Sequence, residues 1–213
     1  MPAITAKICG LSTPDTLDAA LAGRASHVGF VFFPKSPRNV TFDQAEALAR
    51  QAGRRARRVG VFVNPDNDLL AEAIAARLDA VQLHGEETPE RAADIRRRFG
   101  IETWKAIPVR TAADLKAAAL YRDAVDRLLF DARTPKGSDL PGGMGLRFDW
   151  RLLADYRHAL PWALSGGLDA GNVADAVGMT GAGLVDTSSG VESAPGVKDI
   201  GKIAAFCQAV TQL

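Results

Sequence analysis

Hydrophobic and polar residues alternate along the chain in two recurring patterns. Eight short apolar runs predict strands: Ile4–Cys9, His27–Phe33, Arg58–Val63, Ala80–His84, Glu102–Ile107, Arg127–Phe130, Pro161–Leu164 and Gly183–Asp186. Eight amphipathic stretches predict helices between and after them: Thr13–Ala22, Thr41–Gln51, Pro65–Arg77, Thr88–Phe99, Thr111–Tyr121, Phe148–Tyr156, Asn172–Val177 and Asp199–Val210. Strands that alternate with helices in this way indicate βαβ units and a parallel sheet.

Capping residues stand at several of these helix starts. Thr41 and Gln44, three residues apart, have the spacing of a capping box. Ser12–Pro14, Asn64–Pro65 and Thr88–Pro89 each place a capping residue before a proline in the first turn. Eight strands and eight helices in strict alternation favour a single (β/α)8 TIM barrel over the alternative, a doubly wound sheet of eight strands.

Length and composition fit one barrel domain that spans residues 1–213. Of the 213 residues, 47% are hydrophobic and 24% charged, and no linker or low-complexity segment divides the chain. Such a chain can bury a substantial core without the help of a metal or a disulfide.

Charge and cysteine content argue against several classes of partner. A net charge of +1 gives no overall attraction for nucleic acid, and we interpret the basic residues 54–58 as a solvated helix end. The first residues lack the apolar stretch of a signal peptide, and no window approaches the roughly 20 apolar residues of a membrane span. Two cysteines far apart in the chain are typical of free thiols in a reducing compartment. We therefore expect a cytoplasmic protein with no nucleic-acid or membrane partner.

In a (β/α)8 barrel, catalytic groups lie at the C-terminal ends of the strands and in the loops that follow. The first predicted strand ends in Cys9, and the alternation of side chains along a strand places Lys7 on the same face. Cys9 is therefore a candidate catalytic residue, although a free cysteine is more often a small buried hydrophobe.

Two further strands lead into polar residues that could bind substrate. Arg38 stands in the proline-stiffened loop Phe33–Val40, and its planar guanidinium suits a carboxylate or a phosphate. The alternative is a solvated loop arginine. His84 ends the fourth predicted strand, where it either binds substrate or has a structural role.

Asp131 directly follows the apolar run of the sixth predicted strand. A carboxylate at this position is costly to desolvate, which favours its protonated form and suits a general acid. A helix cap or a loop anchor is the alternative. The following segment, Thr134–Gly145, contains four glycines that would permit a mobile lid over the site.

Two glycine-containing turns carry the strongest local signal. Gly166 and Gly167 follow the seventh predicted strand, and Ser188, Ser189 and Gly190 follow the eighth. Loops at these two places of a barrel often hold a phosphate, because glycine lets backbone N–H groups converge on an anion. The turns together predict a phosphorylated small-molecule substrate.

No residue cluster has metal-ligand spacing, and no dinucleotide or Walker motif occurs, so neither a metal nor a cofactor is indicated.

Taken in order, these motifs resemble those of the phosphoribosylanthranilate isomerase family of tryptophan biosynthesis. They run along nearly the whole chain: residues 7–11 (KICGL), 36–38 (SPR), 60–64 (GVFVN), 82–85 (QLHG), Asp131, 142–145 (GGMG), 148–150 (FDW), 165–168 (SGGL) and 188–192 (SSGVE). Each motif is short, and it is their shared order and spacing that make the resemblance specific. Met144 and Thr187 depart from the residue types usual in the family, which bears on loop packing more than on the reaction.

The resemblance implies a cofactor-independent isomerase that carries out an Amadori rearrangement of N-(5-phosphoribosyl)anthranilate to 1-(2-carboxyphenylamino)-1-deoxyribulose 5-phosphate. In the family's mechanism Asp131 would be the general acid that opens the ribose ring, and Cys9, as thiolate, would remove the C2′ proton. The same-face Lys7 could raise the thiolate fraction, and Arg38 would bind the anthranilate carboxylate. The two glycine turns would hold the phosphate. The sequence does not decide between a monomer and a homodimer.

Two alternatives stay open at this point. One is another phosphate-binding barrel enzyme of amino-acid biosynthesis. An indole-glycerol-phosphate synthase would need a lysine acid and several carboxylates at strand ends, and a histidine-pathway isomerase would have an aspartate in place of Cys9. The other is a non-catalytic phosphate-binding barrel, which would need none of Cys9, Arg38 and Asp131. The sequence favours the isomerase and leaves open whether related aminoaldoses are also substrates.

Overall fold

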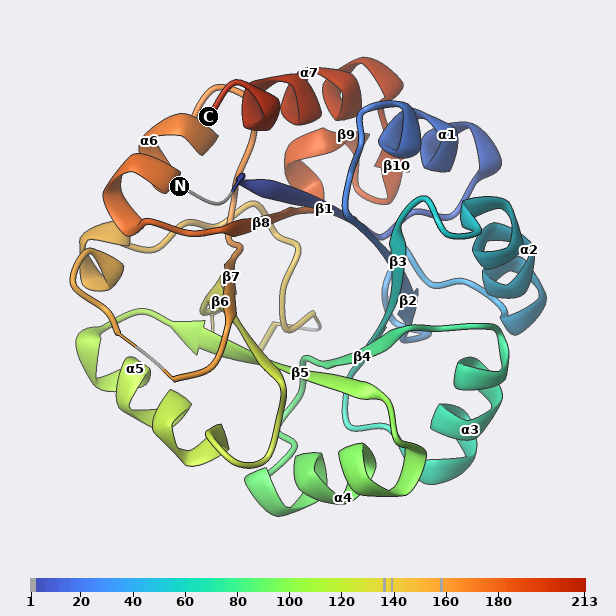
Figure 1. Ribbon diagram of the computed structural model, residues 1–213, viewed down its shortest axis with the longest axis horizontal. Coiled ribbons are helices and arrows are strands. Elements are labelled where there is room, and N and C mark those ends of the chain that lie inside the picture. Colours follow the sequence, from blue (N-terminus) through green and yellow to red (C-terminus); the bar gives the residue numbers. More distant parts are fainter. Residues whose placement is uncertain (1–2, 136, 139, 158) are drawn as a thin grey trace.

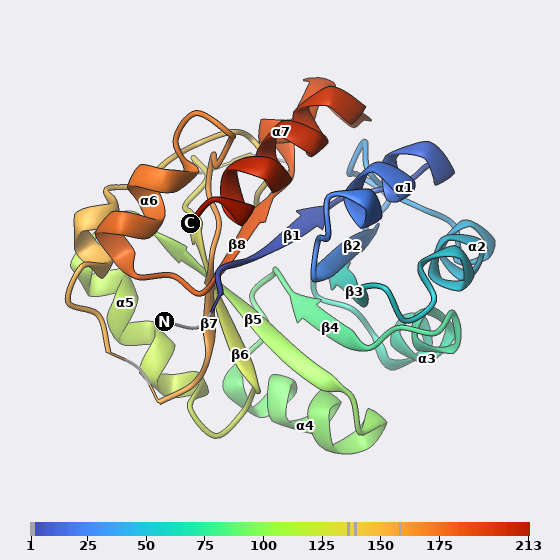
Figure 2. The same ribbon diagram turned by 45° about the horizontal axis from the view of Figure 1, so that its top comes forward.

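The structure, a computed structural model, describes residues 3–135, 137–138, 140–157 and 159–213. Eight parallel strands form a closed barrel in chain order: β1 Thr5–Cys9, β2 His27–Phe32, β3 Arg57–Phe62, β4 Ala80–Leu83, β5 Glu102–Val109, β6 Arg127–Ala132, β7 Trp162–Leu164 and β8 Leu184–Thr187. Figures 1 and 2 show the helices as an outer ring, with β8 lying beside β1 where the barrel closes. The predicted (β/α)8 fold is confirmed.

Seven α-helices occur in the described part of the chain: α1 Pro14–Ala22, α2 Phe42–Ala52, α3 Asn67–Ala75, α4 Pro89–Phe99, α5 Ala112–Ala118, α6 Val173–Thr180 and α7 Ile200–Thr211. None of them combines the length and the apolar character needed to cross a membrane. The predicted capping box is present, because Thr41 and Gln44 each accept a hydrogen bond from the other's backbone N–H. After β8 the chain forms a small antiparallel hairpin, β9 Glu192–Ala194 and β10 Val197–Lys198, before α7.

The helix predicted over Phe148–Tyr156 is wrong. This segment contains only a short 3-10 turn, η2 Trp150–Leu153. The carboxylate of Asp149 accepts hydrogen bonds from both the backbone N–H and the guanidinium of Arg151. Such local side-chain bonds offer the backbone an alternative to a continuing helix.

The predicted start of the third helix at Pro65 is also wrong. Asp66 is the residue that caps α3, since its side chain accepts a hydrogen bond from the N–H of Leu69. Asn64 instead has a left-handed φ of 49° and accepts a hydrogen bond from the N–H of Glu86 in the loop after β4. The side chain that resembled a cap therefore joins two neighbouring loops.

The alternation of side chains along the strands divides the core into two layers. Inward-facing residues form an apolar cluster inside the barrel: Val59, Ala80, Trp104, Ala106, Leu129, Ala163 and Leu184. Outward-facing residues of the same strands, such as Phe62 and Phe130, belong to the larger core beneath the helices. By the same alternation, Asp131 follows Leu129 and Asp186 follows Leu184 on the inward face. The fold thus directs these carboxylates into the mouth of the barrel.

Candidate active site

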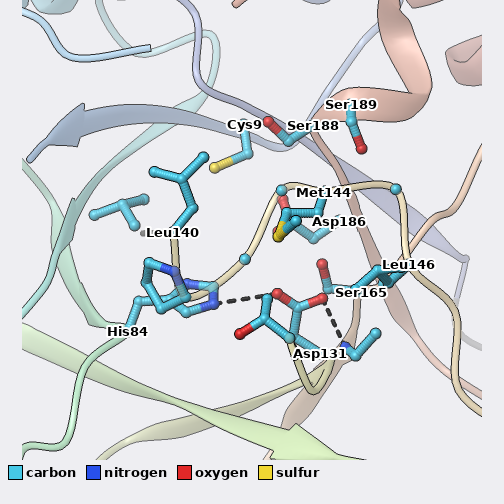
Figure 3. Close-up of a pocket in the computed structure, with 18 of the residues that line it drawn as sticks. Cys9, His84, Asp131, Leu140, Met144, Leu146, Ser165, Asp186, Ser188 and Ser189 are labelled. Atoms are coloured by element: carbon cyan, nitrogen blue, oxygen red, sulfur yellow. Dashed lines mark hydrogen bonds and ion pairs between the residues drawn. The ribbon is translucent and has the colours of Figure 1, made fainter. Parts of the chain in front are cut away.

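A pocket lies at the C-terminal ends of the barrel strands (Figure 3). The residues predicted for the site all line it: Cys9, Arg38, His84, Asp131, Gly166, Gly167, Ser188, Ser189 and Gly190. They come from six strand ends or the loops that follow them, and barrel closure brings them together. Among the described residues, no group of three or more His, Cys, Asp and Glu side chains is arranged to hold a metal ion.

Cys9 is the last residue of β1, and its thiol is buried within the pocket wall. Burial raises the pKa of the Cys9 thiol above its ordinary value. The positive charge of Lys7 lowers this pKa in part, the carboxylate of Asp186 raises it, and Lys198 lowers it. The ionisation of Cys9 therefore depends on which of its buried neighbours are charged.

Asp131 lies near the end of β6, and both of its carboxylate oxygens have partners. Oδ1 accepts a hydrogen bond from the backbone N–H of Ala132 at 2.9 Å, and Oδ2 lies 3.1 Å from Nε2 of His84 (Figure 3). The other ring nitrogen, Nδ1, lies 3.1 Å from Nε2 of Gln82. Because the amide nitrogen of Gln82 donates to Nδ1, the ring proton lies on Nε2, which donates a hydrogen bond to an ionised Asp131. A protonated Asp131 can donate to Nε2 when the Gln82 amide turns over and its Oε1 accepts from Nδ1.

Arg38 is 5% exposed, so the alternative of a solvated loop arginine is wrong. Its Nε and Nη2 donate to the two carboxylate oxygens of Glu192 at 2.7 and 2.8 Å, a bidentate ion pair. Nη2 also donates to the carbonyl oxygen of Gly143 at 2.9 Å. Within the described chain Nη1 has no comparable partner, which leaves it as the guanidinium nitrogen that can bind a further anion.

Glu192 links two sides of the pocket, a role that the sequence analysis missed. Besides Arg38, it accepts a hydrogen bond from Nζ of Lys198 at 2.7 Å. Nζ of Lys198 also donates to the carbonyl oxygen of Ser188 at 2.8 Å. Burial acts to raise the pKa of Glu192, but the hydrogen bonds and charges of Arg38 and Lys198 hold it below its usual value. Glu192 thus stays ionised and joins the arginine to the turn after β8.

The turns after β7 and β8 pack so closely that glycine is required in both. A Cβ at Gly190 would lie 1.9 Å from the carbonyl oxygen of Leu168, which already accepts a hydrogen bond from the Thr187 hydroxyl at 2.7 Å. Gly167 has a φ of 64°, and a Cβ there would lie 2.8 and 2.9 Å from the carbonyl oxygens of residues 145 and 146. A side chain at either glycine would displace the turn that forms this end of the pocket.

The predicted lid, Thr134–Gly145, runs along the pocket, and its residues 136 and 139 lie outside the described residues. A Cβ at Gly142 would lie 2.7 Å from Oδ2 of Asp131 and 2.8 Å from Nε2 of His84, so the backbone there lies directly against this contact. Figure 3 shows further residues of the segment and its continuation around the pocket: Leu140, Met144 and Leu146. The segment therefore covers Asp131, and its mobility stays a prediction.

The closed barrel and the polar pocket at the C-terminal ends of its strands define a (β/α)8-barrel enzyme. Residues 6–209 match the family N-(5′-phosphoribosyl)anthranilate (PRA) isomerase. The chain belongs to the phosphoribosylanthranilate isomerase family, as the sequence motifs predict.

Individual relatives agree with this assignment. The chain is 56% identical over 211 residues to the N-(5′-phosphoribosyl)anthranilate isomerase of Zymomonas mobilis subsp. mobilis, with 99% of each chain covered. The solved phosphoribosyl anthranilate isomerase of Thermotoga maritima is 36% identical, with a TM-score of 0.88 over 99% of this chain and 100% of that one. A solved phosphoribosyl anthranilate isomerase in complex with reduced 1-(o-carboxyphenylamino)-1-deoxyribulose 5-phosphate is 35% identical, with a TM-score of 0.85 and the same coverage.

Proposed function

We propose that the chain converts N-(5-phosphoribosyl)anthranilate to 1-(2-carboxyphenylamino)-1-deoxyribulose 5-phosphate in tryptophan biosynthesis, with Asp131 as general acid and Cys9 as general base. The observation that carries this proposal is that both groups line one pocket, together with an arginine and two glycine turns. An Amadori rearrangement moves protons between oxygen and carbon atoms of the same molecule. A positioned acid and a positioned base are the groups that such a reaction requires.

Asp131 serves the first step, the opening of the furanose ring. Its protonated carboxyl group donates to the ring oxygen as the bond from that oxygen to C1′ breaks, and the nitrogen lone pair forms the Schiff base. His84, 3.1 Å from Oδ2, keeps the carboxyl group aimed into the pocket throughout. The Gly142 backbone, which lies against this contact, limits the access of water to it.

Cys9 serves the second step, the removal of the proton from C2′. The Schiff base makes this proton acidic, because the electron pair left behind is delocalised into the C=N bond. Transfer of the proton to the Cys9 thiolate gives an enolamine, which tautomerises to the C2′ ketone. Since Cys9 ends β1 and Asp131 lies near the end of β6, a substrate bound across the barrel mouth meets both groups.

The two anionic groups of the substrate match two sets of donors in the pocket. Nη1 of Arg38 binds the anthranilate carboxylate, while Glu192 fixes the rest of the guanidinium fork. The turns Gly166–Gly167 and Ser188–Gly190 hold the phosphate through their backbone N–H groups, as in many barrels. His84 lines the same pocket and lies within reach of the bound sugar.

Replacing Arg38 by alanine is expected mainly to raise KM. The lost contact is a charge-assisted hydrogen bond worth about 1.5–3 kcal/mol, which corresponds to a rise of roughly ten- to a hundredfold. Steady-state kinetics of the Arg38→Ala variant check this, with a melting curve to confirm folding after the loss of the Glu192 ion pair. Unchanged KM and kcat in a folded variant would remove Arg38 from the binding site.

Inorganic phosphate is expected to compete with the substrate by occupying the two glycine turns. In a Gly167→Val variant this inhibition should weaken, because a branched side chain at positive φ displaces the turn. Gly100→Val is the matched control, since Gly100 also has a positive φ of 58° but no atom within 4 Å of its Cβ position. Non-competitive inhibition by phosphate would show that these turns are not the substrate's phosphate site.

The activity itself is tested by adding the purified chain to freshly made N-(5-phosphoribosyl)anthranilate and following the loss of its fluorescence. A non-catalytic phosphate-binding barrel would leave the rate of this loss unchanged. We place the reaction in the cytoplasm, where the substrate's pathway would operate, and we expect the enzyme to act either as a monomer or as a homodimer.

A further inference from the structure

Two buried charged residues beside Cys9 have no part in the reaction steps described above. Lys7 and Asp186 face each other across the β1–β8 pair, where they are register partners. Nζ of Lys7 donates to Oδ1 of Asp186 at 2.9 Å, and the two side chains are 0% and 5% exposed. A buried ion pair is seldom worth more to stability than apolar residues of the same size, so its presence here calls for a functional explanation.

Lys7 and Cys9 share one small space above Gly29 of β2. A Cβ at Gly29 would lie 2.8 Å from the Sγ of Cys9 and 3.3 Å from the Nζ of Lys7. Because Gly29 carries no side chain, the ammonium and the thiol can approach each other. Lys7 accordingly acts on Cys9 through its positive charge, which lowers the pKa of the thiol.

The charges around Cys9 do not balance while its thiol is neutral. Lys7 is neutralised by Asp186, whereas Glu192 is paired with two cations, Arg38 and Lys198. When these five side chains are all ionised and the Cys9 thiol is neutral, they carry one net positive charge. Either a Cys9 thiolate or an anionic substrate restores neutrality.

Asp186 also governs the protonation of Lys7. Burial alone would lower the pKa of Lys7, but the carboxylate of Asp186 and the adjacent Cys9 raise it above its ordinary value. Lys7 therefore stays protonated inside the barrel. Lys198, which also faces Cys9, has a pKa lowered by burial, so its positive charge is less strongly maintained than that of Lys7.

We infer that Lys7 and Asp186 are positioning residues that favour the thiolate form of Cys9 against the cost of its burial: Lys7 supplies a stabilising positive charge, and Asp186 keeps Lys7 protonated and in place beside the sulfur. This inference deepens the proposed function and rests on Cys9 being the base. It assigns a purpose to a buried pair that neither the phosphate site nor the acid requires.

The test is the pH dependence of Cys9 alkylation by iodoacetamide, in a Cys207→Ser background that leaves Cys9 as the sole thiol. Alkylation follows the thiolate, so the midpoint of its pH profile reports the ionisation of Cys9 without any need for catalysis. In Lys7→Met the midpoint should rise by more than one pH unit, which lowers the alkylation rate at neutral pH at least tenfold. In Lys7→Met/Asp186→Asn the rise should be smaller, because the repulsive carboxylate is removed as well.

The matched control is Lys105→Met/Glu87→Gln, which removes another buried ion pair, with a separation of 2.8 Å. Its midpoint should equal that of the background protein. A Gly29→Ala variant keeps every charge but pushes Lys7 and Cys9 apart, so its midpoint should rise too, even if the charge variants fail to fold.

A midpoint unmoved in a folded Lys7→Met variant or in Gly29→Ala would overturn the inference, as would an equal shift in the Lys105→Met/Glu87→Gln control. A different set of results would show that the proposed function is wrong while the inference about Lys7 and Asp186 holds. In that case the alkylation midpoints would shift as described, yet Cys9→Ala would retain its isomerase activity.

Discussion

Replacing Cys9 by alanine is expected to lower kcat by about 10²–10⁴-fold while KM changes little, the size typical of a lost general base. Cys9→Ser should be nearly as damaging, because a serine hydroxyl keeps the shape of the thiol but does not ionise near neutral pH. Burial already holds the pKa of Cys9 above its usual value, so a still weaker acid at this position cannot serve as the base. Steady-state kinetics of both variants provide the measurement.

Cys207→Ser is the matched control for this experiment. Cys207 lies in α7, where burial raises the pKa of its thiol to about 11. It does not line the pocket, so its replacement should leave kcat and KM unchanged. Near wild-type kcat in Cys9→Ala would mean that Cys9 is a packing residue.

Asp131→Asn should lower kcat by a similar factor, about 10²–10⁴, and should retain substrate binding. The amide has almost the same shape, and its oxygen can still accept the hydrogen bond from the N–H of Ala132. Its NH₂ group can donate to Nε2 of His84. What the amide lacks is an acidic proton that it can transfer to the ring oxygen, so the ring-opening step should be slowed by this factor.

A carboxylate remote from the pocket shows whether this loss is specific. Asp79 accepts hydrogen bonds from the backbone and the guanidinium of Arg58 just before β4, and it does not line the pocket. Asp79→Asn should therefore lower the free energy of unfolding without lowering kcat. If the two variants lost activity equally, the effect at Asp131 would reflect a general structural weakness.

The fold and the pocket residues could be predicted because each depends on local order in the sequence. Apolar runs and helical stretches in alternation specify the barrel, and the barrel rule places Cys9, His84 and Asp131 at strand ends. The glycine turns could be identified in the same way, since they follow the last two strands. The helix expected at Phe148–Tyr156 failed because the Asp149–Arg151 contact depends on side-chain geometry that an apolar pattern does not reveal.

The charged network could not be predicted, because it depends on partners far apart in the chain. Arg38 and Glu192 are separated by 154 positions, and Lys7 and Asp186 by 179. Alternation shows that Lys7 faces inward, but it does not reveal that strand register sets Asp186 opposite it. One signal was accessible: Asp186 ends the apolar run of the eighth predicted strand, much as Asp131 follows the apolar run of the sixth.

The most direct test of the account is a single-turnover experiment with the enzyme in excess over N-(5-phosphoribosyl)anthranilate, in which the products are separated and identified. Wild-type protein is expected to convert the substrate to 1-(2-carboxyphenylamino)-1-deoxyribulose 5-phosphate, whereas Cys9→Ala and Asp131→Asn should bind the substrate and form this product about 10²–10⁴-fold more slowly. Recovery of unchanged substrate or of anthranilate alone with the wild-type protein, or formation of the ketose at the wild-type rate by either variant, would contradict it.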